Sequence, residues 1–203
     1  MATTQNILIA AVGGQGALLA ARILGSYASG QGFQIKVSEI HGMSQRGGSV
    51  VTHVRFGSEV HSPVIEAGAA DVVLAFELLE AARYVPMLRR GGLVVANMQE
   101  IQPLPVLTGS AKYPSDLLAR FAALPITTVA VDGLREAQAL GNVKTVNTIL
   151  LGAYARRIES EPATWHQAIS ESVRESHRAI NVRAFDRGYQ IADASGSVVG
   201  CTS

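Results

Sequence analysis

Short apolar or alternating runs, each about the length of a strand, recur between segments with helical spacing along most of this chain. They predict six strands, over residues 6–12, 33–39, 49–56, 71–76, 93–97 and 125–131. Helix-forming residues follow at 17–28 and 77–90. Because parallel strands need crossovers and are covered on both faces, this alternation predicts an α/β fold. We expect a single Rossmann-like, three-layer domain with a mostly parallel sheet and helices on both faces.

The second half of the chain predicts a helical C-terminal portion. Residues 98–113 are rich in Pro, Gly and Ser and are expected to form a loop, and a short helical segment follows Pro114. From residue 133 to about 192 the helical signal dominates, and one further helix is expected to begin near Pro162. We therefore predict one domain over residues 1–192 and a flexible, small and polar tail over 193–203.

The composition adds a contact surface to this picture. Of the 203 residues, 48% are hydrophobic and only 16% are charged. So apolar a chain needs extensive buried surface, which a sheet covered on both faces supplies in part. An obligate subunit interface, which resembles a core cut in half, would supply the rest. We expect both.

Charge and targeting features argue against several classes of protein, namely nucleic-acid-binding, membrane and secreted proteins. A formal net charge of +1 without a basic patch gives no reason to expect binding to nucleic acid or to a membrane surface. No apolar run approaches the roughly 20 residues of a membrane span, and no secretory signal is present, so a cytoplasmic protein is expected. The only cysteine, Cys201, allows neither an internal disulfide nor a cysteine-ligated iron–sulfur cluster held by this chain alone.

A glycine turn follows the first predicted strand and opens the first predicted helix. It contains Gly13, Gly14, Gln15 and Gly16. The start of a helix presents unpaired amide groups, and glycines let a phosphate approach them, so this turn is a candidate nucleotide or phosphate site. Close packing of helix against strand also selects glycine, and the full GxGxxG fingerprint is absent because Ala11 stands where such loops often begin with glycine.

Glu39 ends the second predicted strand, 23 positions after Gly16. This spacing is close to that at which an acid binds the ribose of a dinucleotide, which would favour NAD or FAD. Glu39 could equally pair with Arg46 and orient its loop, and an arginine nearby would suit the phosphorylated ribose of coenzyme A or NADP. A solvated carboxylate at the end of a strand is the third alternative.

A polar loop over residues 42–50 leads into the third predicted strand. A hydroxyl, an amide and a guanidinium stand side by side in Ser44, Gln45 and Arg46, and Gly47 and Gly48 allow close backbone approach to a ligand. A tight polar turn would have a similar composition, but the location next to Glu39 favours a binding loop.

Three further polar residues carry weaker signals. His53 has no second metal ligand at a recognisable spacing, so a hydrogen-bonded core or interface histidine is expected and no metal site is predicted. Asp132 follows the sixth strand and suits either a ligand or the N-cap of the next helix. Asn147 lies in an apolar helical segment, where its amide would support a neighbouring loop or contact a partner subunit.

Four segments, taken in order, resemble the gamma subunit or gamma domain of 2-oxoacid:ferredoxin oxidoreductases, and within that family the small beta subunits of the indolepyruvate branch. They are residues 12–16, 39–50 with the 53–55 that follow, 75–77 and 147–153. The run from Met43 to Gly48, Met-Ser-Gln-Arg-Gly-Gly, is the most specific of them. The resemblance covers nearly the whole chain.

The resemblance implies a subunit of a larger enzyme. In this family a 2-oxoacid is decarboxylated on thiamine diphosphate with Mg, electrons leave through iron–sulfur clusters to ferredoxin, and the acyl group passes to coenzyme A. In the indolepyruvate branch a large alpha subunit carries the thiamine diphosphate and the clusters, and the substrates are arylpyruvates. The implied role of the present chain is to help shape the coenzyme A and substrate region, with no catalytic residue assigned to it. The alternative is an autonomous NAD(P)- or FAD-binding Rossmann oxidoreductase that uses the glycine turn and Glu39.

Overall fold

One sheet organises the computed structural model, which describes residues 4–41 and 47–194. Its strand order is β2-β3-β1-β4-β5-β6. Only β3 runs against the other five described strands, because it pairs antiparallel with both β1 and β2 while β1, β4, β5 and β6 pair in parallel. The predicted mostly parallel sheet is confirmed. The strands are β1 (Gln5–Val12), β2 (Gln34–His41), β3 (Ser49–Gly57), β4 (Ala70–Ala75), β5 (Leu88–Asn97) and β6 (Thr127–Val131).

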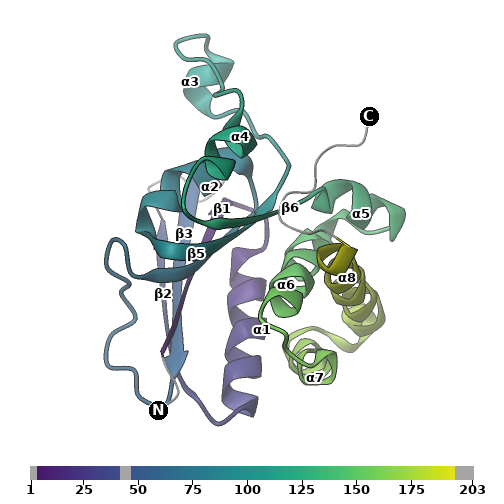
Figure 1. Ribbon diagram of the computed structural model, residues 1–203. Helices are drawn as coiled ribbons and strands as arrows, with labels where there is room; N and C mark the ends of the chain where they lie inside the picture. The colour runs from purple at the N-terminus through teal and green to yellow at the C-terminus, as the bar shows by residue number, and fades with distance from the viewer. Residues whose placement is uncertain (1–3, 42–46, 195–203) are drawn as a thin grey trace.

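Helices cover both faces of the sheet, as Figure 1 shows. One layer contains α1 (Ala17–Gly30), α5 (Gly133–Ala139), α6 (Val146–Arg157), α7 (Pro162–Ser172) and α8 (Glu175–Ala194). The other contains α2 (Leu78–Tyr84) and α4 (Leu117–Ala122). Alternate residues of β1 enter the two cores: Ile7 and Ile9 belong to the first, Leu8 and Ala10 to the second. A strand buried on both faces explains the continuous apolar run, and the three-layer prediction is confirmed.

The helix α6 is the centre of the C-terminal portion. All of its residues from Val146 to Ala155 are buried, between the sheet and α8. It approaches α8 very closely, because a Cβ on Gly152 would overlap the Phe185 carbonyl and a Cβ on Gly188 would overlap the Ile149 carbonyl. The two glycines therefore let the helix backbones touch. Neither role is visible from hydrophobic spacing along a single helix.

The helix predicted near Pro162 is confirmed as α7, and it packs through an aromatic cluster. Trp165 is fully buried and stacks on Tyr27 of α1 with ring centroids 4.0 Å apart. It also stacks on Phe185 of α8 at 5.7 Å and meets the Tyr154 ring of α6 edge-on at 6.0 Å. The indole Nε1 and the Tyr27 hydroxyl both contact Ser160 Oγ, so these two polar groups of the cluster are satisfied.

The helix predicted over 77–90 is shorter than expected. It ends at Tyr84, a 3-10 turn follows at η1 (Val85–Met87), and β5 already begins at Leu88. Pro86 in that turn cannot continue the hydrogen bonding of an α-helix. Gly91 and Gly92 lie between the helix predicted over 77–90 and the strand predicted over 93–97, but in the structure they form an irregularity inside β5, where the register with β4 shifts between Ala70 and Val72.

The segment predicted as a loop over 98–113 contains one short helix, α3 (Leu104–Leu107), and protrudes from the end of the sheet (Figure 1). Buried Glu77 anchors its base, because Glu77 accepts hydrogen bonds from the Ile101 amide and the Tyr113 hydroxyl. At the other end of the chain α8 extends to Ala194, just past the predicted start of the tail, and residues 195–203 lie outside the described part. None of the described helices combines the length and apolar character of a membrane span.

Candidate functional site

The glycine turn joins β1 to α1 in a conformation that requires glycine. Gly14 and Gly16 have φ of 102° and 87°, in the left-handed region that other residues avoid. A Cβ on Gly16 would lie 2.7 Å from Asn147 Nδ2, whereas nothing lies within 4 Å of one on Gly14. Packing against α6 therefore explains Gly16, and open space stands over Gly14.

The turn lies where the topology of the sheet changes direction. The chain leaves β1 through α1 toward β2 on one side, and leaves β4 through α2 toward β5 on the other. The two helices cover opposite faces, so a crevice is expected between the carboxyl ends of β1 and β4. Gln15 fills this crevice: its Oε1 accepts from the Val12 amide at 2.8 Å, and its Nε2 donates to the Phe76 carbonyl at 2.9 Å.

Two further amides extend this contact. Asn97 at the end of β5 donates through Nδ2 to Phe76 O and to Gln99 Oε1, and its Oδ1 accepts from the Gly133 amide at 3.0 Å. Gln99 Oε1 also accepts from Gln15 Nε2. We call Gln15, Asn97 and Gln99 the amide network. It occupies the position where a dinucleotide usually lies in such folds, which weakens the reading of Gly13–Gly16 as a dinucleotide turn.

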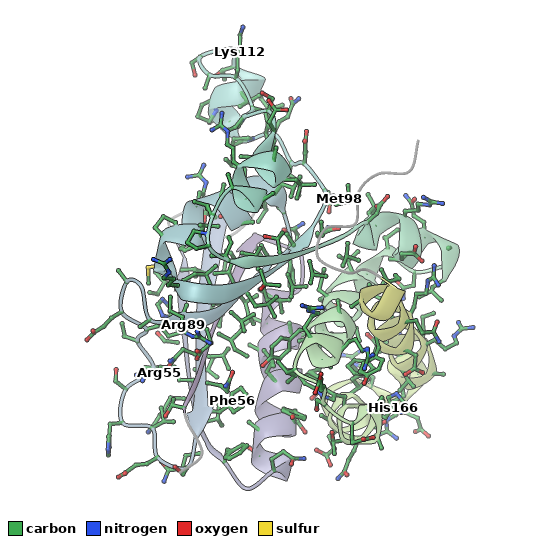
Figure 2. All side chains as sticks on the ribbon, in the orientation of Figure 1. Arg55, Phe56, Arg89, Met98, Lys112 and His166 are labelled. Carbon is green, nitrogen blue, oxygen red and sulfur yellow. The ribbon has the colours of Figure 1, made fainter. Side chains whose placement is uncertain are left out.

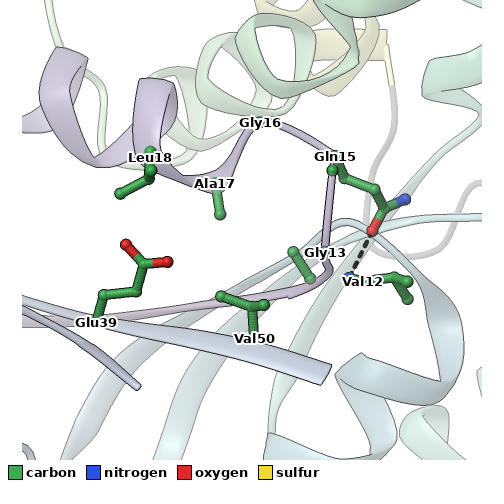
Figure 3. A pocket seen from close by; sticks show the side chains of 10 residues that line it. Val12, Gly13, Gln15, Gly16, Ala17, Leu18, Glu39 and Val50 are labelled. Carbon is green, nitrogen blue, oxygen red and sulfur yellow. Dashed lines mark hydrogen bonds between the residues drawn. The ribbon is translucent and has the colours of Figure 1, made fainter. Parts of the chain in front are cut away.

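An open cavity of about 500 Å³ lies on the other side of the turn, toward β2. We call it the first cavity. Glu39 is its only charged lining residue among those described, and Figure 3 shows Glu39 and Leu18 on opposite sides of it while Gln15 extends away. No hydrogen bond joins Glu39 to another described side chain. The remaining lining residues are Ala11, Val12, Gly13, Gly14, Gln15, Gly16, Ala17 and Val50.

The structure brings most of the predicted site residues together. Gly13 donates its amide to the Gly48 carbonyl at 2.8 Å, and its carbonyl accepts from the Gly47 amide at 3.4 Å. The end of the 42–50 loop is thus fixed beside the glycine turn, and Glu39 lines the same cavity. Ser44, Gln45 and Arg46 lie outside the described residues, so their contacts, including the expected pairing of Arg46 with Glu39, are not described.

A second cavity of about 460 Å³ adjoins the turn on its α6 side. Gly14, Gln15 and Gly16 line both cavities, so the glycine turn is the wall between them. The second cavity was not predicted. It is lined by side chains that come from residues 99–101 and 134–147, and their convergence is a property of the fold that sequence spacing does not reveal.

Two buried carboxylates lie at the start of α2, and one of them, Glu80, connects this helix to the end of the 42–50 loop. Glu77, the N-cap of α2, accepts from the Glu80 amide at 2.8 Å. Glu80 Oε2 accepts from the Ser49 hydroxyl at 2.5 Å, and Arg83 Nε lies 3.2 Å from Glu80 Oε1. Burial raises the pKa of Glu80 above its ordinary value, while the Ser49 hydrogen bond and the Arg83 charge oppose the shift. The sequence predicted no individual role for either carboxylate, because acids at the start of a helix are common.

The three weaker candidates have structural explanations. His53 is buried in β3, its Nδ1 accepts from the Ile65 amide at 3.1 Å, and desolvation lowers its pKa, as a hydrogen-bonded core histidine requires. Asp132 accepts from the Arg135 amide at 3.2 Å and caps α5. Asn147, only 2% exposed, donates to the Gly16 carbonyl at 3.2 Å and so supports the glycine turn.

The sheet order, the two helical layers and the glycine turn define a Rossmann-like α/β subunit fold. The gamma subunit of keto/oxoacid ferredoxin oxidoreductase from Geobacter sulfurreducens has this fold, with a TM-score of 0.71, 23% identity and coverage of 94% of this chain and 99% of that one. A 2-oxoglutarate:ferredoxin oxidoreductase from Magnetococcus marinus, solved with 2-oxoglutarate, coenzyme A and succinyl-CoA, has a TM-score of 0.72 and 18% identity. The match covers 96% of this chain and 32% of that longer chain.

Sequence comparison identifies the family. Residues 6–191 match the pyruvate ferredoxin/flavodoxin oxidoreductase family. An indolepyruvate oxidoreductase subunit IorB from Pyrococcus horikoshii is 41% identical over 199 residues, covering 92% of this chain and 95% of the relative. The chain belongs to the pyruvate ferredoxin/flavodoxin oxidoreductase family. The predicted resemblance is confirmed, and the comparisons support it rather than the autonomous dinucleotide-binding enzyme.

Proposed function

We propose that this chain is the small subunit of a coenzyme A-dependent arylpyruvate oxidoreductase, of the indolepyruvate type. The complex decarboxylates the oxoacid oxidatively, forms acyl-CoA and reduces ferredoxin in the cytoplasm. The observation that carries the proposal is the similarity over nearly the full length of both chains to an indolepyruvate oxidoreductase subunit. The chain is inactive alone, and neither nucleic acid nor membrane is among its partners.

The cofactors belong to a large partner subunit. We assign thiamine diphosphate with Mg, and the iron–sulfur clusters, to that subunit, as the resemblance to the indolepyruvate branch implies. The only cysteine of the present chain, Cys201, lies outside the described residues. The described residues contain no group of three His, Cys, Asp or Glu side chains arranged to hold a metal ion.

Exposed apolar side chains beside the first cavity support a role in assembly. Leu18 lines the cavity and is 60% exposed, and Val37 on β2 is 47% exposed. Val37 and Glu39 lie on the same face of β2, because they are two residues apart in one strand, opposite Val54 and Thr52 of β3. We assign this rim to the partner subunit, which would then close the cavity from the side of β2.

The predicted site residues receive their roles within this arrangement. Gly13, Gly14, Gln15 and Gly16 form the inner wall of the first cavity, with Asn147 supporting the turn from behind. Glu39 lines the same cavity, and we assign it together with the loop of Ser44, Gln45, Arg46, Gly47 and Gly48 to the part of the subunit that faces coenzyme A or the active site. A guanidinium at Arg46 would hold a phosphate or carboxylate through two parallel hydrogen bonds.

Co-expression with the large subunit tests the function directly. We expect the two chains to copurify, and the complex to reduce ferredoxin or a viologen dye only when an arylpyruvate and coenzyme A are both present. The isolated 203-residue chain is the control and should show no such activity. Micromolar binding of NAD(H), NADP(H) or FAD to the isolated chain, together with failure to copurify, would contradict the proposal and favour the autonomous enzyme.

Arg46→Lys in the reconstituted complex tests the assignment of the loop. It should raise KM for coenzyme A or the oxoacid by about tenfold or more, because Lys cannot reproduce a bidentate contact worth about 1.5–3 kcal/mol. Arg90→Lys is the matched control, since Arg90 is exposed on β5 at the opposite end of that strand from the site. Unchanged assembly and unchanged kinetics in Arg46→Lys would remove Arg46 from the site.

A further inference from the structure

The second cavity has an unusual balance of polar groups. Its lining includes one charged residue, Lys144, and no carboxylate among the described residues. The first cavity shows the reverse, with Glu39 as its one charged lining residue in the described part. The glycine turn therefore separates a carboxylate-lined space from a lysine-lined space.

The free polar atoms of the second cavity are hydrogen-bond donors. Gln99 Oε1 accepts hydrogen bonds from Gln15 Nε2 and Asn97 Nδ2. These two donors fix the orientation of the Gln99 amide, with its Nε2 directed away from them. That Nε2 has no acceptor within the described part of the chain. Lys144 Nζ likewise has no acceptor within the described part of the chain. The backbone of Lys144 is held in place because its amide donates to Asn142 Oδ1 at 3.0 Å.

An apolar surface lies next to these donors. Leu19, Ile101, Leu134 and Val146 line the same cavity, together with Val143, which is 52% exposed. A lysine without an ion pair among the described residues, next to this apolar lining, suits a ligand with one charged and one apolar end. A volume of about 460 Å³ falls in the range of small-molecule sites.

We propose that the second cavity binds a compact organic anion with an apolar body, and that Lys144 and Gln99 receive its carboxylate or phosphate. The apolar body lies against Val143 and Leu134. Asn147 already donates to Gly16, so it holds the wall of the cavity in place. The site is separate from the first cavity and does not depend on the proposed function, because ligand binding to the full chain can be measured without any partner or turnover.

Binding to the full chain tests the site, with three probes that share a phenyl group. Phenylpyruvate carries a carboxylate, phenyl phosphate a phosphate, and 2-phenylethanol no charge. Amide NMR titration gives the dissociation constant and shows whether the Gln99 side-chain amide and the amides of Gly14 and Leu19 respond. We expect at least one anion to bind with a dissociation constant on the order of 1 mM or below, and the neutral probe to bind at least about tenfold more weakly.

Charge variants assign the anion to its lysine. Lys144→Gln should weaken anion binding by about tenfold, the loss of one charge-assisted hydrogen bond, and Lys144→Arg should retain most of it. Lys112→Gln is the matched control, because Figure 2 shows Lys112 at the end of the protruding segment, far from Met98 and hence from its neighbour Gln99. Thermal unfolding should be the same for all three variants, since Lys144 is exposed.

The two anionic probes distinguish the sources of the charge. Tighter binding of phenylpyruvate would identify a carboxylate site, and tighter binding of phenyl phosphate a phosphate site, and either result supports the proposal. Equal binding of 2-phenylethanol, equal effects of Lys144→Gln and Lys112→Gln, or no response to either anion would overturn it. An active complex with unchanged anion binding in Lys144→Gln would refute this site and leave the proposed function intact.

Discussion

The Ser49 hydroxyl donates a 2.5 Å hydrogen bond to the carboxylate of Glu80, which is only 4% exposed. Ser49 is the first residue of β3, directly after the paired glycines of the loop, and Glu80 lies in the first turn of α2. The exit of the loop is therefore fixed to a helix on the second face of the sheet. A buried carboxylate in this position also makes the stability of the fold depend on pH.

Glu80→Gln should remove a pH-dependent contribution to stability. The folded state raises the pKa of Glu80 above its ordinary value of 4.5, mainly through burial, so the folded protein binds this proton more tightly than the unfolded chain. That contribution is complete below pH 4.5 and is lost as the pH rises through the folded-state pKa. In urea unfolding from acid to neutral pH, the stability of wild type relative to Glu80→Gln should fall over this window and then level off.

Two companion variants make the comparison specific. Ser49→Ala removes a hydrogen bond that lowers the Glu80 pKa, so the window should move to higher pH. Glu66→Gln alters an exposed carboxylate and should leave the wild-type profile unchanged. A wild-type profile parallel to that of Glu80→Gln across the whole range would contradict the assignment.

Gln15→Ala should destabilise the protein by about 2 kcal/mol, because it leaves the Val12 amide without its side-chain acceptor and takes one donor from the Phe76 carbonyl. Chemical unfolding measures this change in the free energy of unfolding. Gln31→Ala, at the exposed end of α1, is the matched control and should change it by less than about 0.5 kcal/mol. Equal effects of the two substitutions would show that the crevice does not need Gln15.

Gly188→Ala should reduce stability by about 3 kcal/mol, since the added methyl would overlap the Ile149 carbonyl and the α6 and α8 backbones would have to separate. Gly25→Ala is the matched control within a helix. A Cβ there would lie 3.6 Å from Ile35 Cδ1, an ordinary contact, so this variant should gain up to about 1 kcal/mol of helix propensity. The melting temperature should therefore fall in Gly188→Ala and rise in Gly25→Ala. A change of the same sign in both variants would argue against the close approach of α6 and α8.

Tyr154→Phe should raise the free energy of unfolding by about 1 kcal/mol. The Tyr154 hydroxyl is buried without a hydrogen-bond partner among the described residues, and burial raises its pKa, so it remains neutral and its desolvation is not compensated. Tyr113→Phe is the contrasting variant, because that hydroxyl donates to Glu77 and accepts from the Leu79 amide. It should lower stability by about 1–3 kcal/mol. A loss of stability in both would indicate a partner for Tyr154 Oη.

The sequence predicts the central part of the fold well, for physical reasons that particular residues make clear. Ile7 to Ala10 enter two cores on alternate faces, so the first strand has to be apolar throughout. Gly14 and Gly16 need a left-handed backbone, so the turn is marked by glycine whatever it binds. Features of this kind depend on residues that are close together in the sequence, so they can be predicted from the sequence alone.

Contacts between distant segments account for what could not be predicted. Gln15 within a glycine turn has the composition of a ligand loop, and its bonds to Phe76 and Gln99 appear only when β4 and β5 are placed beside β1. Lys144 could not be predicted as a site residue, because its cavity is completed by residues 14–16, Leu19, Gln99 and Ile101, which are distant in the sequence. Gly91 and Gly92 fall between a predicted helix and a predicted strand, and the sequence does not reveal that they lie inside β5, since a glycine pair has the same composition in a turn and in a bulge.

The amide network has one more consequence, for how the protein responds to its surroundings. Gln15, Asn97 and Gln99 carry no group that gains or loses a proton in the physiological range, and their hydrogen bonds join them to backbone atoms of the sheet. The wall between the two cavities should therefore keep one shape over a wide range of acidity and ionic strength. Any pH or salt dependence of ligand binding at either cavity would then report on the charged groups at its edges, or on the ligand itself.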